Sequence, residues 1–303
     1  MLPLIKRFAK EERGTVIVVI AVAFTVLLGF VALAVDTGVL FVQHSRLARA
    51  MDAAALAGAQ ELPDTGKAQF TALDYAGKNN IDPGTLNISF SADNKQITLS
   101  GSKDVDLVFA KFLGFETSDV NARAVAVIKP ISIVKGLMPV GIGDDQLPLT
   151  EGVDYMLKGG AHDGNPWRGI LQFPGYGDGG ADYRNLAREG YNQNIKVGDT
   201  EGKVSGDKSG PTMQGVTDRI EACTDGCTWN HYTEGCPRVA LVPIYHDTGE
   251  SVTVVGFASV FIDRVDGSGN NSRLWARFIN HTISGETDDT ITGSHLNSVR
   301  LVQ

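Results

Sequence analysis

The longest uncharged stretch of this chain includes the apolar run of residues 15–35, which read TVIVVIAVAFTVLLGFVALAV. Such a run has few ways to fold. In an α-helix it rises roughly 31 Å, about the thickness of the hydrocarbon core of a bilayer. We therefore predict one transmembrane helix over residues 15–35.

The segment before this span sets its orientation. Residues 1–14 carry four basic side chains and two acidic ones: Lys6, Arg7, Lys10, Arg13, Glu11 and Glu12. Basic flanks stay in the cytoplasm. We therefore expect a single-pass protein of the cytoplasmic membrane, with residues 1–14 inside and 63–303 outside.

A cleaved signal peptide is the alternative, because residues 32–34 (Ala-Leu-Ala) resemble a small-x-small cleavage site. The apolar run is longer than a usual signal-peptide core, and it is followed by Asp36 and further helix-forming sequence. An anchor is favoured.

The helix is predicted to continue beyond the bilayer over residues 36–62, which lack proline and are rich in helix formers. It should end at Pro63. Near its end lies a helix-packing surface of small residues, composed of Ala54, Ala55, Gly58 and Ala59. Such a surface allows close approach, either by a helix of a partner chain or by the protein's own domain. Both alternatives stay open.

A small α/β domain is predicted over residues 63–130. It should contain a helix at 67–80, a hairpin of strands 86–91 and 95–100, an apolar segment at 105–115 and a strand at 120–128. The turn Asp82-Pro83-Gly84 separates the helix from the hairpin.

Residues 131–303 are rich in glycine and are predicted to form a mainly antiparallel β domain. Expected strands are 153–158, 169–173, 239–245, 251–263 and 273–283, with short helices at 182–189 and 214–221. The segment 251–263 is apolar on both faces, which is typical of a central strand covered on both sides. The fold class is thus α+β: a long pilin-like N-terminal helix, a small α/β domain and a β domain.

Three cysteines lie close together in the sequence, at Cys223, Cys227 and Cys236. Their spacing matches no common zinc, haem or thioredoxin signature. A disulfide in an oxidising compartment is the simpler interpretation, with Cys223 and Cys236 as the expected pair and Cys227 as the alternative partner. Three buried thiols remain the other possibility.

Signatures of enzymes and cofactor sites are not found. The formal charge of −8 argues against nucleic acid as a partner. The glycine-rich stretches 177–180 and 202–206 do not match a phosphate-binding loop, and the histidines lack metal-site spacing. The segment that starts at Asp266 has Asn271 where a calcium loop needs glycine and Arg277 where it needs a carboxylate, which favours a hairpin tip. Weak calcium binding in the Asp-rich loops stays open as the alternative. We expect no catalytic residue, cofactor or metal. Glycosylation at Asn87, Asn270 and Asn280 also stays open.

The N-terminal fifty residues resemble a known protein family. The features that carry the likeness are Arg13-Gly14 before the apolar run, Ala34-Val35-Asp36-x-Gly38 at its end, Arg46-Leu47 and the segment 52–59 (DAAALAGA). As a set, residues 13–62 resemble the N-terminal module of the TadG-like proteins of Tad/Flp (tight-adherence) pilus systems. The resemblance implies an envelope-anchored structural protein of pilus assembly or adhesion, with other pilus or envelope proteins as partners through this helix.

The resemblance also marks Gly14 and Thr15 as a possible processing junction, because pilins of this class are cut after a glycine. The mature helix of these pilins carries a glutamate at its fifth position. In this chain, the fifth residue counted from Thr15 is Val19. That departure favours an uncleaved anchor or a minor pilin-like subunit over a major filament subunit. Incorporation into an extracellular pilus is the alternative location. A binding module of another membrane system, displayed on a stalk, is the alternative function.

Overall fold

The computed structural model describes residues 12–160, 169–267 and 271–302, with side chains described from residue 16 onward. The chain divides into two compact units. The first comprises Met1–Ala126 with Leu301–Gln303, and the second comprises Val127–Arg300. Most of the basic segment 1–14 and the centre of the loop 266–271 lie outside the described residues.

The first unit is built on α2 (Glu12–Ala59), one continuous helix of 48 residues. This confirms the predicted helix that runs through the apolar span and beyond it, although α2 ends three residues earlier than expected. Its two halves differ in burial. The side chains of residues 16–35 are exposed except for a half-buried Ala32, whereas Leu47, Met51 and Ala54 are fully buried.

A second helix, α3 (Thr65–Lys78), packs against the C-terminal part of α2. It begins directly after Asp64, whose side chain caps it. Oδ1 of Asp64 accepts hydrogen bonds from the backbone N–H groups of Gly66 (3.1 Å) and Lys67 (3.0 Å), which satisfies donors that the first turn leaves unpaired. The helix predicted at 67–80 is confirmed with slightly shifted ends.

The predicted hairpin is also present. β1 (Leu86–Phe90) pairs antiparallel with β2 (Gln96–Asp106), with Leu86 opposite Gly101 and Phe90 opposite Ile97. β2 is longer than predicted. It leads into a short 3-10 turn, η2 (Ala110–Leu113), and then into β3 (Thr117–Pro130). The four-stranded sheet has the order β1-β2-β3-β13, where β13 (Asn297–Val302) is a strand that sequence reasoning missed.

The second unit is organised around a sheet of order β5-β10-β11-β12-β6, formed by Ile142–Gly143, Val239–Asp247, Val252–Asp266, Arg273–Ile279 and Asp154–Lys158 in that order. All pairs along it are antiparallel except the short parallel pair of β5 with β10. β9 (Thr200–Lys203) pairs with β11 and with β7 (Leu171–Gln172). A separate two-stranded sheet joins β4 (Ile133–Val134) to β8 (Ile195–Lys196).

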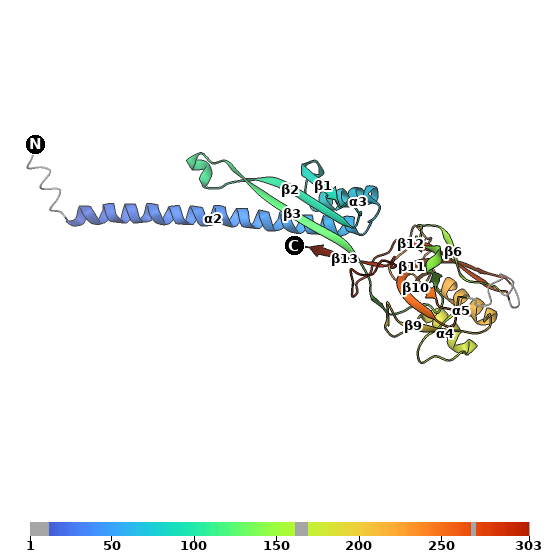
Figure 1. Cartoon of the computed structure of the whole chain (residues 1–303). Helices are drawn as coiled ribbons and strands as arrows, with labels where there is room; N and C mark the ends of the chain where they lie inside the picture. The colour runs from blue at the N-terminus through green and yellow to red at the C-terminus, as the bar shows by residue number, and fades with distance from the viewer. Residues whose placement is uncertain (1–11, 161–168, 268–270, 303) are drawn as a thin grey trace, which may run out of the picture. The chain divides into compact units, whose positions relative to one another are not determined.

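The central strand is β11, as its apolar sequence predicts. Val260 and Ile262 belong to one buried cluster, which also contains residues of α4 (Gly180–Glu189) and α5 (Ser209–Glu221). Val254 and Phe257 belong to a second buried cluster. The strand is thus covered on both faces. With both predicted short helices present, the α+β class is confirmed (Figure 1).

Candidate functional sites in the N-terminal helix and the thiol cluster

The first candidate site is the exposed part of α2. It is the one helix among the described residues that is long and apolar enough to cross a membrane, and the most apolar stretch of it has no buried residue. Exposed large apolar side chains run from Val16 to Val35. A continuous apolar surface of this size is unfavourable in water and requires lipid or protein around it.

Asp36 ends this span, and its carboxylate is fully engaged. Oδ1 accepts hydrogen bonds from the backbone N–H groups of Val108 (2.7 Å) and Phe109 (3.1 Å). Oδ2 accepts one from Phe109 (3.2 Å) and one from Ala110 (2.7 Å). Burial acts to raise the pKa of Asp36, but the hydrogen bonds from these three amides, helped by the charge of Lys111, hold that pKa below its ordinary value.

The sequence analysis named Asp36 as the end of the apolar run and as part of a family pattern, but it did not predict these hydrogen bonds. The partners lie more than 70 residues away in a segment read simply as apolar. A single acidic residue directly after an uncharged span was the available signal.

The possible processing junction lies at the start of the same helix. Gly14 and Thr15 fall within the first turn of α2, which begins at Glu12. Cleavage there stays a prediction.

The small-residue surface lies inside the first unit. Ala54, Ala55 and Ala59 are fully buried. A Cβ atom placed on Gly58 would lie 2.8 Å from Cδ1 of Ile97, 2.9 Å from the carbonyl oxygen of Ala68 and 3.0 Å from Cβ of Ala72. The small residues thus admit α3 and β2, and of the two alternatives the structure favours packing under the protein's own domain.

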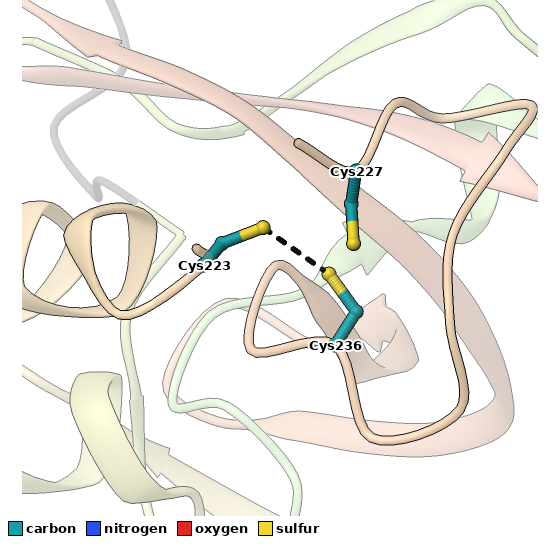
Figure 2. A group of neighbouring side chains, drawn as sticks. All are labelled: Cys223, Cys227 and Cys236. Atoms are coloured by element: carbon teal, nitrogen blue, oxygen red, sulfur yellow. Dashed lines mark hydrogen bonds between the residues drawn. The ribbon is translucent and has the colours of Figure 1, made fainter. Parts of the chain in front are cut away.

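The second candidate site is the group of three cysteines, which the fold brings together (Figure 2). Their sulfur atoms all lie within 4.8 Å of one another, and Sγ of Cys223 is 3.6 Å from Sγ of Cys236. Cys227 and Cys236 are buried beside Phe261 and Ile279. All three are free thiols here, so the disulfide stays a prediction.

The thiols differ in acidity because of their arrangement. A hydrogen bond from the thiol of Cys236, followed by one from the backbone of Thr233, lowers the pKa of Cys227 to about 7. Burial and the same contact with Cys227 raise the pKa of Cys236 to about 12. Of these two buried thiols, Cys227 therefore forms a thiolate more readily than Cys236.

This arrangement supports two kinds of chemistry. In an oxidising compartment, neighbouring thiols form a disulfide, and closing Cys223 to Cys236 needs the sulfurs to approach by about 1.5 Å. As thiolates, the three sulfurs also form a donor set for a soft metal ion. The sequence spacing did not predict that all three would meet.

Comparison with known protein families gives a match to the N-terminal helix. Residues 14–61 match the family model described as putative Flp pilus-assembly TadE/G-like. No curated protein and no solved structure matches the chain. The matched segment nearly coincides with α2, and this likeness supports a pilus-related function and a single-pass membrane anchor. Residues 14–61, which cover most of α2, are thus similar to the TadE/G-like module of Flp pilus assembly.

Proposed function

We propose that this protein is a structural component of Flp-type pilus assembly, anchored in the cytoplasmic membrane by residues 15–35, with both folded units on the extracytoplasmic side. The observation that carries the proposal is the division of α2. Its N-terminal part is an exposed apolar span. Its C-terminal part, which belongs to the same family-matched segment, is buried under residues 60–126 of the first unit, which we call the head.

The division of α2 suits a subunit that works in or from a membrane. A helix packed on its own domain along its whole length would have no surface left for lipid or for another chain. Here the exposed apolar surface is confined to the N-terminal part, which is where contact with other pilus or envelope proteins is proposed.

Between the roles within such a system, we favour an uncleaved anchor or a minor, pilin-like subunit. Val19 stands where pilins of this class carry the glutamate that aids docking into the filament. Its side chain is exposed and apolar, so it suits lipid in a permanent anchor.

A genetic test uses the organism that carries the gene. Deleting the gene should reduce surface pili, and the full-length chain should restore them. A chain with Leu27→Arg and Leu28→Arg should fail to restore them, because each buried charge at the bilayer centre costs roughly 2.5–3.5 kcal/mol.

The matched control is Phe70→Arg, an exposed position on α3 outside the span, which should restore pili normally. Unchanged piliation after deletion would contradict the proposal. If the deletion leaves piliation unchanged and the wild-type chain is found in the membrane fraction, a binding module of another membrane system would be the better assignment.

The orientation needs a separate test, since it depends on the basic flank. Protease added to intact spheroplasts should digest the head, and a head protected until the membrane is dissolved would reverse the topology. N-terminal peptide mapping of membrane and sheared-pilus fractions then distinguishes an intact N-terminus from one that begins at Thr15.

A further inference from the structure

The turn that Asp36 clamps carries an unusual amount of exposed apolar surface. Phe112, Leu113 and Phe115 are 79%, 80% and 65% exposed, and Val108 and Phe109 are also exposed. We call residues 108–115 the apolar turn. Apolar side chains grouped on one short turn usually mark a site that meets lipid or protein.

The position of this turn along α2 follows from three contacts, two made by β2 and one by Val108 in the turn itself. Ile97 lies beside Gly58. Nζ of Lys103 lies 3.4 Å from Oε1 of Gln43, and the N–H of Val108 binds Asp36. β2 therefore runs along α2 toward the N-terminus of α2. The η2 turn, which connects β2 to β3, lies at the end of these two strands (Figure 1).

The apolar turn thus reaches the outer end of the proposed span. Ala32 lies one helical turn before Asp36 on the same face, and it is the single half-buried residue among residues 16–35. η2 contacts α2. Beyond Asp36 the helix stays apolar for another turn and a half, with Phe41 widely exposed.

A carboxylate at this depth needs compensation, because an unpaired charge near hydrocarbon is costly. The three amides supply it by donating hydrogen bonds to the buried carboxylate of Asp36. The one cation of the turn is Lys111, whose Nζ lies over the ring of Phe112 at 5.7 Å from its centroid. A lysine beside apolar side chains can bury its apolar stem among them and keep its ammonium group at the headgroups.

We propose that the apolar turn inserts into the extracytoplasmic interface of the bilayer, with Phe112, Leu113 and Phe115 among the acyl chains and Lys111 at the headgroups. The proposal rests on the anchoring proposed above. The membrane is favoured as occupant because the turn is continuous with the apolar surface of the span. The inserted turn is a second contact with lipid, and the hydrogen bonds of Asp36 hold it to α2. Together, the span and the turn fix the tilt and the height of the head relative to the membrane.

The test uses the full-length chain in phosphatidylethanolamine–phosphatidylglycerol vesicles, with tryptophan reporters at Phe112→Trp and, as the matched control, Phe70→Trp. Phe70 is 75% exposed on α3 of the same unit. Both variants retain the chain's three native tryptophans. The fluorescence of these tryptophans is measured on the unsubstituted chain and subtracted from both.

The Phe112→Trp reporter should emit at shorter wavelength than Phe70→Trp. Lipids brominated near the headgroup end of the acyl chain should quench it at least twofold more strongly, and diluting the protein in lipid should not change this. A reporter that these lipids leave unquenched would overturn the proposal. Loss of the wavelength shift on dilution in lipid would also overturn it, because another copy of the chain would then be the occupant.

A carbonate wash of the same vesicles separates this inference from the anchoring. Retention of the protein together with an unquenched reporter refutes insertion of the turn while the anchor stands. Release of the protein by carbonate refutes the anchor, and the inference with it.

Discussion

The carboxylate of Asp36 accepts a 2.7 Å hydrogen bond from the backbone N–H of Val108, 72 residues further along the chain. This contact joins the end of the apolar span to the tip of the β2–β3 hairpin. It connects the part of the molecule that resembles a pilus-assembly module with the part that the family model does not cover.

Replacing Asp36 by alanine should release the apolar turn. The amides of Val108, Phe109 and Ala110 would lose their acceptors, and their hydrogen exchange should accelerate by about tenfold or more. Exchange at the buried amides of Ile97 and Leu99 should be nearly unchanged, and equal acceleration there would show general unfolding instead.

The same clamp should depend on pH in one direction. The pKa of Asp36 is lowered in the folded chain relative to the ordinary value of 3.8. Its stabilising contribution is therefore fully present above that ordinary value and is lost as the pH falls through the folded pKa. Exchange of the three amides, corrected for its intrinsic pH dependence, should stay slow near neutral pH. Release of the turn at neutral pH would contradict the assignment.

Gly58→Leu should lower the stability of the first unit by roughly 1–3 kcal/mol, because the space beside Gly58 is already filled by Ala68, Ala72 and Ile97. Thermal unfolding in detergent measures the effect. The matched control is Gly38→Ala, at a helical position with no atom within 4 Å of the added Cβ. It should be neutral or stabilising. An unchanged Tm for Gly58→Leu would instead indicate that the small-residue surface contacts another chain.

Protein isolated from its native envelope should contain a disulfide between Cys223 and Cys236, with Cys227 as the remaining thiol. The loop closed is short, so the expected stabilisation is roughly 3 kcal/mol by the chain-entropy model. Non-reducing peptide mapping identifies the pair. Three freely alkylated thiols would refute it, and three thiols that react only after a chelator is added would indicate a bound metal ion.

Glu201 should make the second unit less stable as the pH rises. Its side chain is 3% exposed. Burial, and then the charge of Asp199, raise its pKa from 4.5 to about 7. The folded state therefore holds its proton more tightly than the unfolded state, and up to roughly 3 kcal/mol is lost between pH 4.5 and 7. Glu201→Gln should remove most of this dependence in thermal unfolding, and an unchanged pH profile would exclude Glu201 as its origin.

The sequence predicted the features that depend on local composition. An uncharged run of apolar residues specifies a helical span, and the spacing of apolar residues over 67–80 specified the second helix. The apolar character of residues 251–263 specified the central strand, because such a segment has no polar face to present to water.

Features that depend on contacts between segments distant in the chain could not be predicted from the sequence. The hydrogen bonds of Asp36 with residues 108–110 involve backbone groups, which leave no pattern in side-chain identity. The surface around Gly58 had two equally good explanations until the positions of Ala68 and Ile97 showed what fills it. The spacing of Cys223, Cys227 and Cys236 indicated a disulfide, but the convergence of all three sulfurs depends on how residues 223–236 fold back beside Phe261.

The most direct test of the central claim is photo-crosslinking from the exposed span in living cells. A benzoylphenylalanine at Phe24, an exposed position within residues 15–35, should yield adducts with other Flp pilus-assembly proteins. The same probe at Phe70 on the head should yield few of them. Protein adducts from Phe24 only with proteins that have no part in pilus assembly would contradict the account.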